Sequence, residues 1–181
     1  TDIPVYAGIG HPLVAEADVE TVPIQLLAGM EELEYRKDMD GVEYLRRSLA
    51  ASQGDITLVT IGPLTNVGVL LCKHPEVKGK IKEIVMMGGA YYMHYNEWNI
   101  LCDPEAAHIV YSSGVPIRAI GLDVTTRCQV NDQLVTMFRN SKKPEVELLA
   151  DLLTCYYENR GRHTFLHDPM AVFAVYDKDI I

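Results

Sequence analysis

The chain alternates between short apolar runs, most of which end in glycine, and longer segments in which apolar residues recur with helical spacing. The apolar runs are rich in Ile, Val, Leu and Met, and they lie at residues 3–7, 56–61, 84–87 and 116–122. Continuous apolar runs of this length are typical of strands that are buried on both faces of a parallel sheet. These runs therefore predict a sheet at the centre of the molecule.

Helical patterns lie between these runs, at residues 41–51, 64–73 and 104–111, and after the last of them, at residues 131–138, 145–157 and 170–176. Asp103 and Asp168 each precede a proline, and Asp followed by Pro is a favoured N-cap and first helical position. The alternation predicts an open, mostly parallel α/β sheet with helices on both faces. At 181 residues we expect residues 1–181 to form a single domain.

Composition narrows the classes of partner. The chain is 48% hydrophobic, which predicts a globular fold, and its net charge of −9 argues against a nucleic acid polymer as ligand. Its four cysteines form no CxxC pair, which indicates reduced thiols and a cytoplasmic protein. No apolar run reaches the roughly 18–20 residues of a membrane span, so we expect no membrane association.

Polar side chains follow the predicted strands. Asn66 follows the second run, Glu97 and Asn99 follow the third, and Asp123 follows the fourth. Ligands of open parallel sheets bind at the carboxyl ends of the strands, so these groups are expected to converge. Asn66 and Asp123 either orient this rim or only stabilise its turns. The sequence has no GxSxG nucleophile elbow and no P-loop, which weakens the case for a different hydrolase chemistry.

His167 and Asp168 precede Pro169. The residues alone allow two interpretations: a capped helix with an incidental histidine, or part of a site in which a titratable ring lies beside a carboxylate that could bind a metal.

Four segments together resemble the inosine-uridine-preferring nucleoside hydrolase family. Residues 56–66 (ITLVTIGPLTN) are similar to its LVATGPLTN motif, and residues 82–90 (KEIVMMGGA) to its KEIVIMGGA motif. Residues 97–107 (EWNILCDPEAA) resemble EFNIxxDPEAA, and residues 166–169 match LHDP. The motifs occur in the family's order and approximate spacing. The resemblance covers nearly the whole chain and implies a Rossmann-like nucleoside hydrolase fold.

This resemblance implies an enzyme that uses water and a bound Ca²⁺ to cleave the N-glycosidic bond of ribonucleosides, through an oxocarbenium-like transition state. Asp168 matches a Ca²⁺ ligand, and Ile61 matches a position that binds the metal through its backbone carbonyl, where the family usually has Thr. His167 matches a histidine near the ribose and the leaving base, and is a candidate for protonating that base.

Glu97 and Asn99 match residues that bind ribose hydroxyls, and their spacing would place both on one side of an extended segment. Met87 matches a residue that packs on the sugar, although a core role is equally consistent with its position. A base-binding segment is expected before His167. Its polar and aromatic residues could stack on a purine or be solvated surface: Tyr156, Tyr157, Arg160, Arg162 and His163.

The chain departs from the family in two places. The family's Asp-rich DTDxGxDDA segment, which supplies most Ca²⁺ carboxylates and the catalytic base, is absent, and residues 15–40 contain no HGxxGL motif. One carboxylate and one carbonyl are too few for Ca²⁺, which takes about 6–8 oxygens. Both ends of the chain look cut, and we expect a truncated fold.

Two explanations remain open. The chain is either a piece of an enzyme, completed by other residues or by a separate polypeptide, or a degenerate homologue without activity. In both cases we expect the chain alone to hydrolyse nucleosides weakly or not at all. The alternative function is a non-catalytic binding or assembly module. The resemblance also implies a homo-oligomer, a dimer or a tetramer, that acts on a small-molecule nucleoside.

Overall fold

The computed structural model describes residues 3–16, 34–177 and 179. These residues fall into two compact units, which are described separately. The first contains residues 3–16, 34–124 and 167–179, and holds the sheet. The second contains residues 125–166.

The first unit is built on three parallel strands in the order β1-β2-β3. They are β1 (Ile56–Thr60), β2 (Ile81–Met87) and β3 (Ile117–Ile120). Val59 of β1 pairs with Val85 of β2, which pairs with Arg118 of β3. Three of the four predicted strands are thus confirmed. Because the strands are parallel, their carboxyl ends meet at one edge of the sheet.

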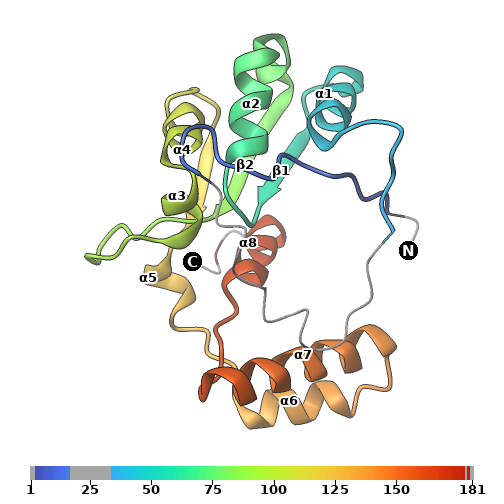
Figure 1. The fold of residues 1–181 in the computed structure, drawn as a ribbon, viewed down its shortest axis with the longest axis vertical. Coiled ribbons are helices and arrows are strands. Elements are labelled where there is room, and N and C mark those ends of the chain that lie inside the picture. Colours follow the sequence, from blue (N-terminus) through green and yellow to red (C-terminus); the bar gives the residue numbers. More distant parts are fainter. Residues whose placement is uncertain (1–2, 17–33, 178, 180–181) are drawn as a thin grey trace. The chain divides into compact units, whose positions relative to one another are not determined.

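Three helices cover one face of this sheet: α1 (Gly41–Ala51), α2 (Thr65–Lys73) and α4 (Pro104–Tyr111). They lie side by side (Figure 1). Their apolar stripes form the core with Ile84 and Met86 of β2, both fully buried. Gly68 lets α2 approach α4 closely, since a Cβ there would lie 3.1 Å from the Cβ of Ala106. The 3-10 helix η2 (Pro75–Lys80) leads into β2.

The opposite face is covered by α8 (His167–Tyr176). Side chains alternate along a strand, so Val85 points away from Ile84 and Met86, and it is also fully buried. Arg118 of β3 donates to the backbone carbonyl of Ala174 and forms an ion pair with Glu83 at 3.1 Å. This contact attaches α8 to the sheet and confirms the prediction of helices on both faces.

The predicted strand at residues 3–7 is wrong. Only Tyr6 makes a bridge, with Arg36, while Ile3 and Val5 are 74% and 53% exposed. The run is part of an arm, residues 3–16, that lies outside the sheet, with the Tyr6 ring stacked on Tyr44 at 4.4 Å. An apolar run becomes a strand only where a sheet edge accepts it, and the backbone of this run bonds only to Arg36 and Gly41 among the described residues.

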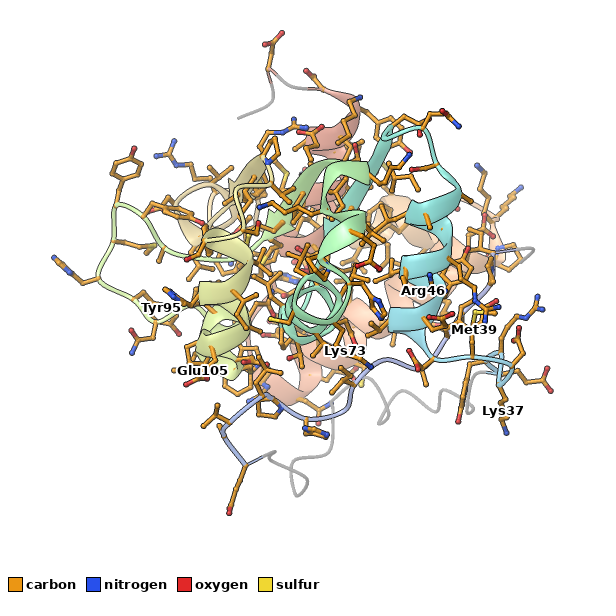
Figure 2. All side chains as sticks on the ribbon, turned by 90° about the horizontal axis from the view of Figure 1, so that it is seen from above. Lys37, Met39, Arg46, Lys73, Tyr95 and Glu105 are labelled. Atoms are coloured by element: carbon orange, nitrogen blue, oxygen red, sulfur yellow. The ribbon has the colours of Figure 1, made fainter. Side chains whose placement is uncertain are left out.

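Helix boundaries at the carboxyl edge also differ from the prediction. Helix α8 begins at His167, so Asp168 lies in its first turn and is not the residue that precedes the helix. Pro169 is tolerated there because N–H groups of the first turn have no partner within the helix. Two short helices, α3 (Trp98–Cys102) and α5 (Leu122–Thr125), were not predicted from the sequence. The segment before α3 projects outward with Tyr95, which is 66% exposed (Figure 2).

The second unit is a helical pair, α6 (Asp132–Arg139) and α7 (Pro144–Arg160). Asn131 caps α6 by accepting from the Leu134 N–H, and α7 ends at Gly161, whose φ of 65° is left-handed. Arg139 and Asp151 join the helices at 2.9 Å. No helix in the described part of the chain is both long and apolar enough to span a bilayer.

Candidate functional site

The carboxyl ends of β2 and β3 are joined by backbone hydrogen bonds. The N–H of Gly88 donates to the carbonyl of Ile120 at 3.2 Å, and the N–H of Leu122 donates to the carbonyl of Gly89 at 2.9 Å. Gly89 has a φ of +86°, a conformation that favours glycine. The edge where ligands bind in open parallel sheets is therefore a rigid surface of backbone.

Glu97 lies on this surface although it is only 5% exposed. It caps α3, and its carboxylate accepts three backbone hydrogen bonds. Oε2 accepts from Gly89 at 3.0 Å and Ile100 at 3.0 Å, and Oε1 accepts from Asn99 at 2.9 Å. Buried carboxylates persist where hydrogen bonds replace their hydration. This carboxylate is consequently held in one orientation at the end of β2.

Asn99 reaches the same strand end. Its Nδ2 donates to the backbone carbonyl of Met87 at 3.1 Å and lies 3.3 Å from the Met87 sulfur. Met87 is 3% exposed, so it is part of the core. The expectation of an extended segment is wrong, because Glu97 precedes α3 and Asn99 lies within it. The two side chains nevertheless converge, since the start of α3 lies against the end of β2.

His167 and Asp168 lie half-buried in the first turn of α8. Burial lowers the pKa of His167 below its usual value, while the carboxylates of Asp168 and Glu97 oppose this shift. Burial raises the pKa of Asp168; the His167 ring opposes the increase and Glu97 adds to it. Since Glu97 influences both groups, the structure brings the start of α8 close to the end of β2. Both residues favour their neutral forms more than they would in water.

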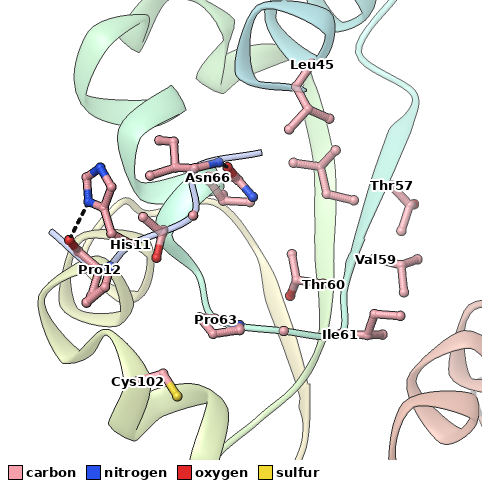
Figure 3. Close-up of a pocket in the computed structure, with 16 residues that line it drawn as sticks. His11, Pro12, Leu45, Thr57, Val59, Thr60, Ile61, Pro63, Asn66 and Cys102 are labelled. Carbon is pink, nitrogen blue, oxygen red and sulfur yellow. Dashed lines mark hydrogen bonds between the residues drawn. The ribbon is translucent and has the colours of Figure 1, made fainter. Parts of the chain in front are cut away.

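Ile61 follows β1 and its side chain is 48% exposed. Figure 3 shows Val59 and Ile61 on one side of β1 and Thr60 on the other. A largely apolar cavity of about 600 Å³ runs along β1 and residues 9–12, and it is lined by Ile61 and by Asn66, but not by Glu97, Asn99, His167 or Asp168. The Thr60 hydroxyl is buried without a hydrogen-bond partner among the residues that the structure describes.

The described residues do not by themselves fit a complete Ca²⁺ site. Among them, no three His, Cys, Asp or Glu side chains are grouped so that they could hold a metal ion. Asp168 and the carbonyl of Ile61 would supply at most about three oxygens, whereas Ca²⁺ takes about 6–8.

Three polar side chains of the rim accept hydrogen bonds from backbone N–H groups. Asp103 caps α4 as predicted, by accepting from the Ala106 N–H at 3.0 Å. Its other oxygen binds the Thr65 hydroxyl at 2.5 Å and the Leu13 N–H at 3.1 Å, which the sequence did not indicate. Asn66 accepts from the Ile9 N–H at 2.8 Å. Asp123 accepts from the N–H groups of residues 91 and 92 at 2.7 and 2.9 Å.

In the second unit, the Tyr157 and His163 rings lie 4.6 Å apart, and His163 Nε2 is 3.1 Å from an Asp132 carboxylate oxygen. The structure therefore groups two of the residues suggested for base binding. Their role with a base stays a prediction.

Replacing Asp168 with asparagine is expected to stabilise the chain in chelator at pH 7. The raised pKa means that the folded state binds the proton more readily than the unfolded state, so ionised Asp168 reduces stability as pH rises above its unfolded value near 3.8. Asparagine removes that charge. The thermal midpoint should rise by a few degrees at most, since 1 kcal/mol corresponds to about 2–4 °C in a chain of this size. Calorimetry at pH 7 and at pH 3 tests this, and an equal shift at both values would contradict it.

Nucleoside hydrolases are similar to this chain in both sequence and structure. The family model for inosine-uridine preferring nucleoside hydrolase matches residues 1–181. Pyrimidine-specific ribonucleoside hydrolase RihB of Escherichia coli O1:K1 is 35% identical over 174 residues, which cover 88% of this chain and 55% of the relative. The chain thus spans little more than half of that relative's length.

Two solved structures share the fold. A purine-preferring ribonucleoside hydrolase from Gardnerella vaginalis has a TM-score of 0.83 and 30% identity, over 97% of this chain and 62% of its own. A plant nucleoside hydrolase has a TM-score of 0.84 and 27% identity, over 98% of this chain and 61% of its own.

Proposed function

Because the chain belongs to the inosine-uridine preferring nucleoside hydrolase family, we propose that it forms part of a site that hydrolyses the N-glycosidic bond of ribonucleosides. The products are ribose and the free base. The observation that carries this proposal is the convergence of Glu97 and Asn99 on the end of β2, next to the start of α8 with His167 and Asp168.

The remaining hydrogen-bonding capacity suggests how a ribose would bind. Glu97 Oε2 already accepts two N–H groups, while Oε1 accepts only one among the described residues. A carboxylate oxygen accepts about two hydrogen bonds, so Oε1 would accept a ribose hydroxyl. Asn99 donates through Nδ2, and its Oδ1 would accept a second hydroxyl. Met87, held by Asn99, would contact the sugar only through the small part of its surface that is exposed.

His167 is the proposed proton donor to the leaving base. The lowered pKa of His167 favours the neutral ring at pH 7. Only the protonated ring can act as an acid, so its contribution should decline as the pH rises above this pKa, which lies below the usual 6.5. Asp168 and the Ile61 carbonyl are the proposed Ca²⁺ ligands within this chain. The support for Ca²⁺ is the family resemblance and the hard oxygen chemistry of these groups.

We further propose that the partner is a small-molecule nucleoside, that the protein acts in the cytoplasm, and that it assembles as a dimer or tetramer. The net charge of −9 supports a ligand other than a nucleic acid polymer. The four cysteines, which form no CxxC pair, support a reducing compartment, and the family resemblance supports the oligomer.

Nucleoside binding by this chain tests the proposal. Inosine and uridine are both used, because the relatives include purine-preferring and pyrimidine-specific enzymes. Asn99→Ala and Glu97→Gln should each weaken binding by about threefold to tenfold, the value of one net hydrogen bond. Glu105→Gln, at an exposed position of the neighbouring helix, is the matched control.

Hydrolysis of the same nucleosides and of a chromogenic riboside, with Ca²⁺ and with chelator, shows whether this chain alone is catalytic. Binding without turnover by this chain is the expected result, and it is shared with a non-catalytic binding module. Chelator-sensitive turnover would establish the enzyme and would contradict our expectation that the chain alone is weak. Unchanged affinity in both site variants would place the ribose elsewhere and overturn the proposal.

A further inference from the structure

The peptide group between Gly88 and Gly89 is held from both of its sides. Its carbonyl oxygen accepts a hydrogen bond from the Tyr91 hydroxyl at 3.3 Å. Its N–H donates to Glu97 Oε2 at 3.0 Å. A trans peptide group is planar, with its carbonyl and N–H pointing in opposite directions. A partner that fixes the carbonyl direction therefore also fixes the direction of the N–H that orients Glu97.

Tyr91 is itself held tightly. Its oxygen lies 2.5 Å from the Tyr111 hydroxyl, and its N–H donates to Asp123 at 2.7 Å. Its ring packs against two glycines, since a Cβ on Gly89 or Gly121 would lie within 2.9 Å of its atoms. A phenol has one proton. If Tyr91 donates that proton to the Gly88 carbonyl, Tyr111 must donate to Tyr91.

The protonation state of Tyr91 suits this arrangement. Burial raises the pKa of Tyr91 above its usual value. The hydroxyl therefore remains a donor throughout the neutral pH range. Hydrogen bonds in series polarise one another, so a donor at the Gly88 carbonyl strengthens the Gly89 N–H as a donor to Glu97.

We propose that Tyr91, supported by Tyr111, is a positioning residue for the Glu97 carboxylate and acts through the Gly88–Gly89 peptide group. Its importance for ribose binding rests on the proposed function of Glu97, whereas the hydrogen-bond relay itself does not. The relay is specific to the hydroxyl, because the ring fills the space above the two glycines with or without its oxygen. Removing only the hydroxyl should therefore loosen Glu97 with little effect on packing.

Amide hydrogen exchange in the ¹⁵N-labelled chain tests the relay without any activity. In Tyr91→Phe, exchange at Gly89 should be about threefold to tenfold faster, the value of one net hydrogen bond. Exchange at Val85, in the centre of β2, should not change. Tyr111→Phe should act in the same direction, and the double variant should show less than the sum of the two effects, because both hydroxyls act through one chain.

Tyr92→Phe is the matched control, because the neighbouring Tyr92 is 95% exposed. It should leave exchange at Gly89 unchanged. Unchanged exchange at Gly89 in Tyr91→Phe would overturn the proposal. Equal acceleration at Gly89 and Val85 would also overturn it, since that result would mean that the hydroxyl only stabilises the fold.

Inosine and uridine binding by the same variants separates this inference from the proposed function. Weaker binding in Tyr91→Phe, together with local loosening at Gly89, supports both the relay and the ribose role of Glu97. Local loosening at Gly89, with the affinity of the unmodified chain kept in both Tyr91→Phe and Glu97→Gln, supports the relay and contradicts the ribose role of Glu97.

Discussion

Replacing Asp103 with alanine is expected to reduce the free energy of unfolding by about 3–5 kcal/mol, the typical result of removing one partner from a buried charged network. Asp103 is fully buried, and its carboxylate accepts from Ala106, Thr65 and Leu13. Alanine would leave three donors without an acceptor. In a chain of this size, the thermal midpoint should fall by roughly 10 °C.

Two further variants show which part of the effect comes from which contact. Asp103→Asn keeps an oxygen for the cap of α4 and an amide that can donate to the Thr65 hydroxyl, but it has no acceptor for Leu13. Its loss of stability should be intermediate, with faster amide exchange at Leu13. Glu105→Ala, at an exposed position of the same helical turn (Figure 2), should change stability by less than about 0.5 kcal/mol. A small effect of Asp103→Ala, comparable with that of Glu105→Ala, would contradict the prediction.

Replacing Gly89 with alanine is expected to have the second large effect, about 3 kcal/mol or more, from two separate sources. Its φ of +86° is unfavourable for a residue with a Cβ. The new Cβ would also lie 2.7 Å from the Tyr91 hydroxyl oxygen and 2.8 Å from its ring. The ring cannot easily move, because Tyr111 and the Gly88 carbonyl hold its hydroxyl.

Gly114→Ala separates these two sources. Gly114 also has a positive φ, of 77°, but a Cβ there would meet only the end of the Lys78 side chain at 3.6 Å. Gly114→Ala should therefore lose only the stability that the positive φ costs, about 1–2 kcal/mol. Urea denaturation measures the loss of stability in both variants. The difference between the two losses is the part that comes from the contact with Tyr91. Equal losses would mean that Tyr91 moves aside without difficulty, and would contradict the expected loss from packing.

Much of the fold could be predicted because the signals are local. The β-branched runs at β1, β2 and β3 and the Asp-Pro start of α4 depend on strand burial and on helix capping, which act over a few residues. The run at residues 3–7 has the same local signal, yet it forms only one bridge. Strand formation requires a neighbouring strand, and no local pattern reports whether one is available.

The candidate site was predicted in part. The sequence identified Glu97 and Asn99 after a strand end, and the structure places both on that end. It did not indicate that Glu97 is buried and bound by three backbone N–H groups, because two of these lie in α3, which was predicted as extended. Five residues are too few to show a helical period, so such a helix is recognised only from its contacts.

By itself the sequence determined an α/β chain with three parallel strands, the longer helices that lie between and after them, and the segments that meet at the carboxyl edge of the sheet. Each of these follows from short-range preferences or from the geometry of parallel strands. Only the tertiary structure decided that Asp103 joins the arm, α2 and α4, and that Tyr91 reaches back to the peptide group that orients Glu97. Such contacts join groups brought together by packing, and hydrogen bonds between them form only after the core has placed their partners within about 3 Å.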